Sequence, residues 1–461
     1  MFKVRCYCLV KIKLPLHQAK YSNNIIIFIR FIIMVRKCTT SLGLLLFSGS
    51  LFAMSAPPSE LHTEIVFTNS TPDTLMVTLS GDANVKQNVT QVLPQSTVSL
   101  VDINRHVGID DQLNIQLSSA NYQINLLQQS ADNQFSFGAN AGDLTVGMQQ
   151  DTEIQRYQTT LNGHVNTLAF SANDLDDGGK VRYVLQQEDI KPVLGGANQL
   201  NLLSYNIWAS SEYSAQEINT RMKEMPKVLS GYDVLVLTEV LDKNIDKKLL
   251  NNIATEYPYQ SKDIFEVGRL IASGIRVLSH WPVEDKQYLK FNACNAAQCI
   301  ITRGVTYMKI NKQGKPYHIF ATHPQAFDDV ESREGRLLQL QEMRDFIKGM
   351  NIPADEAVIL AGDFNINKIG LPADRDYMET ILSATEPENR GHTLTYDSNT
   401  NFWAEKPYIE YLDYTLIGND NLQPTSAYQE VFVPRSTKDD LWGKWNLSDH
   451  YPVRGVFIYP N

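Results

Sequence analysis

The stretch Ser448-Asp449-His450-Tyr451-Pro452-Val453 places an acid and a histidine side by side, just before an apolar run. Alone, this pair is ordinary. It becomes informative because polar residues follow four earlier apolar, β-branched runs, each of which predicts a buried strand. These residues are Asn206 after NLLSY, Glu239 after VLVLT, His323 after YHIFAT, and Asp363 with Asn365 after VILAG. Because loops beyond strand ends carry the chemistry of layered α/β domains, we expect these side chains to converge at one edge of a sheet.

The converging residue types point to a divalent cation and a phosphate ester. Carboxylate and amide oxygens suit Mg²⁺, which prefers hard oxygen ligands. Glu239 and Asn206 are therefore candidate metal ligands, although either residue could instead cap a helix or turn. Imidazole titrates near neutrality, so His450 is a candidate general base. Asp363 and Asn365 lie two apart and would point to one side of an extended segment.

Seven motifs carry a family resemblance over residues 200–461. They occur in the order seen in the endonuclease/exonuclease/phosphatase superfamily: NLLSYNIW, LTEVLD, THPQAF, GDFNINK, GHTLTYD, EYLDYTL and LSDHYPV. THxQA, GHTxTxD and EYLDY are more specific, and the set resembles the bacterial neutral sphingomyelinases (sphingomyelin phosphodiesterase C). This resemblance implies an α/β (α+β) four-layer sandwich of deoxyribonuclease-I-like type. It also implies Mg²⁺-dependent hydrolysis of sphingomyelin to ceramide and phosphocholine.

The resemblance also implies a role for each polar side chain. Glu239 and Asn206 would form the central metal pair. His450 would take a proton from water, oriented by Asp413. The remaining residues would position water or stabilise charge: His323 at a phosphoryl or departing oxygen, Asp363 and Asn365 beside the attacking water, and Asp449 at a metal-bound water network or a second cation.

Two tryptophans near the last motif suggest contact with lipid. Trp442 and Trp445 lie in the polar stretch RSTKDDLWGKWNL. Indole favours the headgroup region of a bilayer, so on an exposed hairpin they would anchor the protein to a sphingomyelin-containing membrane. Related sphingomyelinases carry an aromatic-tipped hairpin at this place. The alternative is a core helix. Phe402-Trp403 is a further candidate for the contact surface.

Residues 57–192 read as an all-β accessory domain, and 193–461 as the phosphodiesterase domain. Short alternating runs such as Glu64-Ile65-Val66-Phe67-Thr68 recur in residues 57–192, separated by turn signals such as Asn162-Gly163. An all-β sandwich precedes the joint Pro192–Asn198 on this reading. The oxygen-rich turn 173–179 is either a Ca²⁺ site or a solvated acidic hairpin.

Residues 1–56 read as a signal or targeting region. They hold eight Lys or Arg and no acid, and Arg36-Lys37 precede the apolar run from Leu42 to Phe52. Met34 is a candidate true start, and an uncleaved N-terminal anchor is the alternative. We therefore expect a secreted, extracellular protein, which we take to be a monomer.

Cys294 and Cys299 are the two cysteines beyond the targeting region. A disulfide closing this small loop is plausible in an exported protein, and a pair of free or metal-binding thiols is the alternative. The resemblance would instead pair Cys294 with a cysteine after THPQA, where this chain has Asp328-Asp329-Val330.

Net charge separates the rival functions. Residues 193–461 carry 35 acids against 27 bases, a net charge of −8. A secreted nuclease of the same fold would display basic surface for phosphate backbones, so we expect no nucleic-acid partner. Two other rivals remain: a phospholipase C acting on other choline lipids, and a lipid-binding or pore-forming protein led by the β-rich segment.

Overall fold

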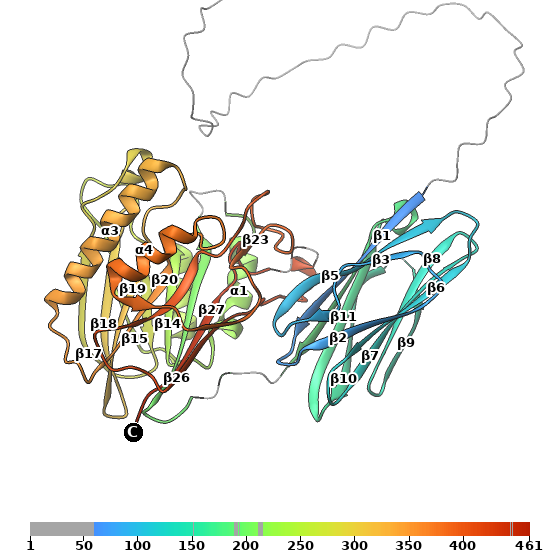
Figure 1. The fold of residues 1–461 in the computed structure, drawn as a ribbon, viewed down its shortest axis with the longest axis horizontal. Coiled ribbons are helices and arrows are strands. Elements are labelled where there is room, and N and C mark those ends of the chain that lie inside the picture. Colours follow the sequence, from blue (N-terminus) through green and yellow to red (C-terminus); the bar gives the residue numbers. More distant parts are fainter. Residues whose placement is uncertain are drawn as a thin grey trace, which may run out of the picture. The chain divides into compact units, whose positions relative to one another are not determined.

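The computed structural model describes residues 60–461 except 151, 189–191, 193, 211–214, 443 and 445. The targeting region and the candidate start Met34 lie outside the described residues. The described chain comprises a β-rich segment, 60–187, and a mixed segment, 199–461, whose strands are coloured by sequence in Figure 1.

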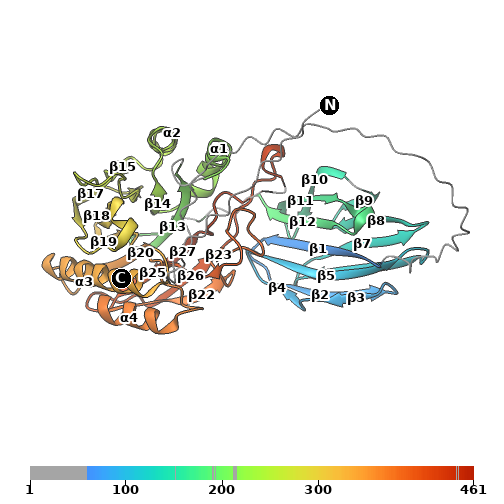
Figure 2. The same cartoon turned by 90° about the horizontal axis from the view of Figure 1, so that it is seen from above.

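The segment 60–187 is built from two six-stranded sheets (Figure 2). Their orders are β10-β11-β12-β1-β5-β3 and β4-β2-β6-β7-β8-β9. Alternate side chains, such as Ile65 and Phe67 of one sheet and Ile115 and Leu117 of the other, meet in a single apolar core. The strands are β1 (Glu60–Ser70), β2 (Leu75–Gly81), β3 (Val85–Gln87), β4 (Gln91–Val92), β5 (Ser96–His106), β6 (Asp111–Ser118), β7 (Gln123–Ala131), β8 (Gln134–Ala141), β9 (Leu144–Gln149), β10 (Thr152–Leu161), β11 (His164–Asn173) and β12 (Lys180–Gln187), with a short 3₁₀ helix η1 (Leu175–Asp177).

The described residues of the segment 199–461 form two larger mixed sheets and four α-helices. The sheet orders are β15-β16-β14-β13-β27-β26-β22 and β17-β18-β19-β20-β25-β21, with a separate pair β23-β24. The strands are β13 (Gln199–Ala209), β14 (Val234–Val240), β15 (Tyr259–Gln260), β16 (Arg276–Ser279), β17 (Val283–Lys290), β18 (Gly304–Lys312), β19 (Lys315–Thr322), β20 (Ala357–Asp363), β21 (Ala384–Thr385), β22 (Glu388–Gly391), β23 (Tyr396–Asp397), β24 (Ile409–Glu410), β25 (Asp413–Gly418), β26 (Ser426–Val431) and β27 (Val453–Ile458). The helices are α1 (Ile218–Leu229), α2 (Lys243–Ile253), α3 (Val330–Gly349) and α4 (Pro372–Leu382), with 3₁₀ turns η3 (Ala296–Ile300) and η4 (Asp439–Leu441).

The central strands are buried on both faces, which explains their continuous apolar sequences. Leu202 of β13 and Ile359 of β20 belong to one cluster that joins the two sheets. Leu203 of β13 points the other way and packs in a cluster with Met225 of α1. Leu360 of β20 likewise packs in a cluster with Leu340 of α3. Successive strand residues therefore serve opposite faces.

The predicted strands are present, and each is slightly longer than its apolar run. Helix α3 begins at Val330, where Asp329 caps it: the Asp329 side chain accepts a hydrogen bond from Ser332 N at 3.0 Å. Among the described helices, none has the length and apolar character needed to cross a membrane.

Candidate active site

The parallel pair β13 and β14 brings two predicted site residues together. Asn206 lies opposite Thr238 in the strand register, so Glu239 follows immediately beside it. Asn206 Nδ2 donates a hydrogen bond to Glu239 Oε1 at 3.2 Å. Parallel strands end at the same edge of a sheet, so the two polar residues meet as their positions predicted.

The antiparallel pair β20 and β25 brings two carboxylates together in the second sheet. Asp363 and Asp413 are direct cross-strand partners. Asn206 Nδ2 also donates to Asp363 Oδ2, at 3.0 Å. The buried Asn206 amide therefore links Glu239 of the first sheet to Asp363 of the second.

His450 lies between these two carboxylates. Its Nδ1 is 2.8 Å from Asp413 Oδ2, and its Nε2 is 3.8 Å from Asp363 Oδ2. The ring of Tyr396 meets the imidazole edge-on, with centroids 5.0 Å apart. Burial would lower the pKa of His450, but Asp413 and Asp363 raise it well above its usual value. The arrangement orients the ring through Nδ1 and directs Nε2 toward the site.

His323 is a second imidazole near Asp363. Its Nε2 lies 3.5 Å from Asp363 Oδ2, and its backbone carbonyl accepts a hydrogen bond from Arg303 Nη1 at 3.1 Å. Burial, with Arg303 nearby, lowers the pKa of His323 to about 3. His323 is therefore neutral at physiological pH and carries one N–H that can donate.

The expectation that Asp363 and Asn365 belong to one extended segment is wrong. The strand ends at Asp363, and Asn365 has φ +52°. Asp363 Oδ1 accepts from Asn365 N at 2.9 Å and closes a turn, while Asn365 Nδ2 donates to Pro324 O at 3.0 Å. Turn chemistry, not strand alternation, sets the direction of the Asn365 side chain.

Gly362 allows the two strand ends to approach closely. It has φ +144°, and a Cβ at this position would lie 2.0 Å from the carbonyl oxygen of Thr322. A side chain is thus excluded where β20 packs beside β19. The residues that follow these positions, Asp363 and His323, are held within reach of each other as a result.

Left-handed backbone also marks the site. Glu239 has φ +57° and Trp208 has φ +46°, in addition to Asn365. Non-glycine residues rarely adopt this conformation, and they concentrate at functional sites where the surrounding structure enforces it.

The site accumulates negative charge that a cation would relieve. Burial and repulsion from Asp449 raise the pKa of Glu239 to about 7. Burial raises the pKa of Asp413 to about 6 and also raises the pKa of Asp449. Within the described residues, Asp363, Asp413 and His450 place ligand atoms within 4.8 Å of one another. These oxygen-rich groups fit a divalent metal, and Asn206 joins Glu239 to them.

The predicted membrane residues differ in their surroundings. Trp442 is partly buried, and Trp445 lies outside the described residues. Phe402 is 53% exposed, whereas Trp403 is buried and its Nε1 donates to Asn446 O at 2.7 Å. Only Phe402 of the described members therefore presents a large exposed apolar side chain.

Several residues that support the site were not singled out from the sequence. The buried guanidinium of Arg221 donates to the backbone carbonyls of Ile207 and Leu447 at 3.2 and 2.8 Å, tying α1 to strand β13 and to the loop that precedes His450. Arg303 holds the His323 carbonyl. Tyr396, which lies against His450, is part of the GHTLTYD motif, so its place in the motif was the available signal.

The two late cysteines are bonded to each other. Cys294 and Cys299 form a disulfide with Cα atoms 5.3 Å apart. This closes the local loop without a cysteine after THPQA, and the free-thiol alternative is wrong.

This geometry, with two imidazoles and buried carboxylates at the joined edges of two sheets, is matched by a known class of hydrolases. The chain belongs to the Endonuclease/Exonuclease/phosphatase family, whose model matches residues 203–450. Within it, the chain is a bacterial sphingomyelinase C relative: it is 34% identical over 255 residues to sphingomyelinase C of Listeria ivanovii, covering 49% of this chain and 76% of that protein.

Other relatives give the same assignment. Sphingomyelinase C 2 of Leptospira interrogans is 31% identical over 293 residues, or 57% of this chain, and the match spans about half (46%) of that longer protein. Among solved structures, sphingomyelinase C of Streptomyces griseocarneus superposes with a TM-score of 0.52 at 28% identity, covering 56% of this chain and 99% of that one. A Staphylococcus aureus beta toxin variant with bound magnesium ions also gives 0.52, at 26% identity, covering 57% and 100%. These matches support the deoxyribonuclease-I-like fold.

Proposed function

We propose that this protein hydrolyses sphingomyelin to ceramide and phosphocholine. The observation that carries the proposal is the continuous polar chain from Asp413 through His450 and Asp363 to Asn206 and Glu239. It offers an oriented imidazole beside an oxygen-rich cation site, the two elements that phosphodiester hydrolysis by activated water requires. Family membership supports the same reaction and the lipid substrate.

His450 serves as the general base in this proposal. Asp413 orients it through Nδ1, so that Nε2 accepts a proton from the attacking water. The water oxygen forms the new bond to phosphorus, and the bond from phosphorus to the ceramide oxygen breaks. The departing ceramide oxygen takes up a proton.

Glu239 and Asn206 are proposed to hold Mg²⁺. When bound, the ion supplies positive charge that polarises the phosphate, stabilises the leaving oxygen and offsets the carboxylates that raise the pKa of His450. The raised pKa of Glu239, to about 7, supports a cation here, because a neighbouring positive charge would favour its ionised form.

The remaining polar side chains are assigned to stabilisation and positioning. Neutral His323 donates to a phosphoryl or departing oxygen. Asp363 and Asn365 position the attacking water. Asp449, whose Oδ1 accepts from Ser448 Oγ at 3.1 Å, holds the water network around the metal or a second cation.

The proposal extends to the organisation of the chain. The sheet-joining core and the two outer helix-bearing clusters support a four-layer α/β/β/α sandwich in residues 193–461. Residues 57–192 would form an accessory β domain, and residues 1–56 would direct export of a monomeric enzyme to the extracellular space. Membrane contact through Trp442 and Trp445 stays a prediction.

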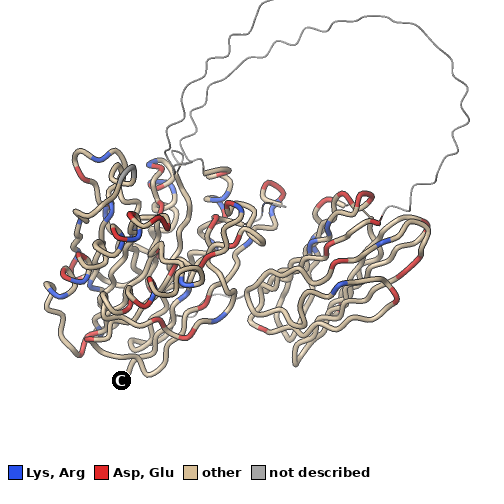
Figure 3. The backbone as a smooth tube through the Cα atoms, turned by 45° about the horizontal axis from the view of Figure 1, so that its top comes forward, with Lys and Arg blue, Asp and Glu red and all other residues tan. Residues whose placement is uncertain are grey.

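A nuclease of this fold is the main rival. In Figure 3, Lys and Arg positions of the segment 199–461 are interspersed with Asp and Glu positions. With the net charge of −8 on residues 193–461, this pattern favours a zwitterionic lipid surface, which has no net charge, over a polyanion.

Product analysis tests the proposal. The purified protein is incubated with vesicles of sphingomyelin, vesicles of phosphatidylcholine, or DNA, each with Mg²⁺ or with EDTA. We expect phosphocholine from sphingomyelin in Mg²⁺ alone. Release from phosphatidylcholine only would identify a different phospholipase C, and cleavage confined to DNA would overturn the lipid assignment.

A further inference from the structure

A loop in the segment 199–461 exposes large apolar side chains. Between β15 and β16, Phe265 is 58% exposed, Val267 93% and Leu270 79%. Scattered exposed apolar residues are normal on soluble proteins, but a cluster within six residues marks a candidate contact surface.

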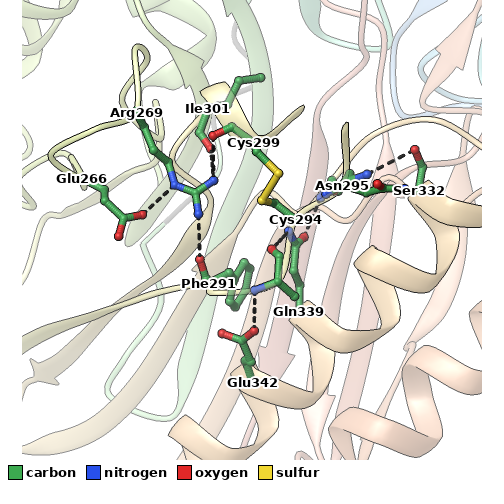
Figure 4. Close-up of a disulfide and its surroundings, with 12 residues drawn as sticks. Glu266, Arg269, Phe291, Cys294, Asn295, Cys299, Ile301, Ser332, Gln339 and Glu342 are labelled. Atoms are coloured by element: carbon green, nitrogen blue, oxygen red, sulfur yellow. Dashed lines mark hydrogen bonds and ion pairs between the residues drawn. A yellow bond between two sulfur atoms is a disulfide. The ribbon is translucent and has the colours of Figure 1, made fainter. Parts of the chain in front are cut away.

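The loop is held firmly at its base by Arg269. The guanidinium donates to Glu266 Oε2 at 2.6 Å through Nε, and to the carbonyls of Cys299 and Ile301 at 2.9 and 3.2 Å through Nη1. Figure 4 shows this guanidinium directed at the loop closed by the Cys294–Cys299 disulfide. The two loops are thus joined into one braced unit.

Ile300, the residue that follows the disulfide-closed loop, adds a fourth apolar side chain. Leu270 N donates to Ile300 O at 2.9 Å, which places Ile300, 42% exposed, beside Leu270. Phe265, Val267, Leu270 and Ile300 are called the apolar rim below. Glu266, the acid at its base, is paired with Arg269 and Lys290, at 2.6 and 3.4 Å, so charges below the rim offset each other.

The rim lies at the same sheet edge as the candidate active site. Val240, next to Glu239, donates from its backbone N to Gly274 O at 3.0 Å, where the loop returns to β16. Arg303 donates to Gln298 Oε1 at 3.0 Å and to His323 O at 3.1 Å, connecting the disulfide-closed loop to the catalytic edge.

The loop after His323 continues this apolar character. Asn295 N, in the disulfide-closed loop, donates to Gln325 Oε1 at 2.8 Å. Two residues further on, Phe327 is 63% exposed. Apolar side chains therefore stand on two neighbouring loops that flank His323.

We propose that the apolar rim inserts into the surface of a sphingomyelin-containing bilayer and seats the active site over a lipid headgroup. This inference rests on the proposed function, because a lipid substrate brings its phosphate to the enzyme within a bilayer. A loop already held by hydrogen bonds loses little conformational entropy on insertion. Transfer of its apolar side chains from water into the bilayer lowers the free energy. Trp442 and Trp445 are not required for this contact.

The test compares membrane and soluble substrates in two matched double variants. Val267→Glu/Leu270→Glu places two charges on the rim. Leu338→Glu/Tyr377→Glu places the same charges on exposed positions of α3 and α4, where the residues are 60% and 57% exposed. Each protein is assayed on sphingomyelin vesicles and on a water-soluble short-chain sphingomyelin.

We expect the rim variant to lose at least about tenfold in vesicle hydrolysis and in co-sedimentation with vesicles, since charged groups are costly in the bilayer. Its turnover of the soluble substrate should stay within about twofold of the parent, and the control variant should match the parent throughout. Unchanged vesicle hydrolysis by the rim variant, or an equal loss on both substrates, would overturn the proposal.

Two further measurements separate this inference from its alternatives. A Val267→Trp protein should show a blue-shifted emission component with sphingomyelin vesicles, and no shift would count against insertion. If the parent is a dimer that Val267→Glu/Leu270→Glu converts to a monomer, the rim is an interface between copies and the proposal fails. Vesicle binding does not require turnover. If the parent binds vesicles through the rim but does not hydrolyse sphingomyelin, the proposed function is wrong and the inference about the rim still holds.

Discussion

Asp363 and Asp413 are directly opposed partners on antiparallel strands, and the imidazole of His450 contacts the carboxylates of both. Like charges opposite each other destabilise a strand pair. Here the cost falls at the sheet edge where the oriented imidazole lies. We interpret the pair as a feature that lowers the folding stability of the protein but serves the proposed reaction.

Replacing Asp413 with Asn should separate these two effects. The variant keeps the shape of the side chain but removes the charge that orients His450, so turnover of sphingomyelin should fall by about 10³-fold. The thermal midpoint should stay equal or rise, because the variant removes a buried charge: burial outweighs the attraction to His450 and raises the pKa of Asp413 to about 6. Activity within a few fold of the parent would remove Asp413 from the mechanism.

Glu239→Gln should weaken metal binding without unfolding the protein. In the parent, Mg²⁺ should raise the thermal midpoint, since an ion that binds only the folded state stabilises it by about 2.7 kcal/mol at a hundredfold excess over Kd. The variant should need at least about tenfold more Mg²⁺ for the same shift. Glu331→Gln, at an exposed position of α3, is the matched control. An identical Mg²⁺ response in Glu239→Gln would contradict the assignment.

Buried His323 should make the protein sensitive to acid. Its pKa is about 3 when folded, below the usual value near 6.5, so the unfolded state binds the proton more tightly. The stabilisation is present above about pH 6.5 and is lost as the pH falls toward 3. Urea titrations should show the parent losing about 1.4 kcal/mol more per pH unit in this window than His323→Gln. Parallel losses in the two proteins would argue against a neutral buried ring.

The ion pair of Lys312 and Asp233 should be essential for folding stability. Both side chains are fully buried, with Nζ 2.8 Å from the carboxylate. Lys312→Met leaves an uncompensated buried charge and should lower the free energy of unfolding by about 3–5 kcal/mol. The exposed control Lys248→Met should change it by less than about 0.5 kcal/mol. If the free energy of unfolding recovers in Lys312→Met/Asp233→Asn, the unpaired buried carboxylate of Asp233 is the cause of the loss in Lys312→Met.

Much of the site could be predicted from local patterns. Buried strands are recognisable as continuous apolar runs. The polar residue after each run indicates the sheet edge where the candidate site lies, as for Asn206, Glu239 and His323. Asn365 was harder, because its αL turn depends on a hydrogen bond to Asp363 Oδ1 that strand alternation does not encode.

The residue types that follow each strand, and the family that they indicate, can be read from the order of amino acids, because side-chain identity and hydrophobic periodicity are local properties. The pairing of Asp363 with Asp413, the bridge from Asn206 to both sheets, and the position of Ile300 beside Leu270 arise only in the folded protein. These relations join residues far apart in the chain. Strand register, sheet packing and the Arg269 contacts set their distances, and no local pattern records them.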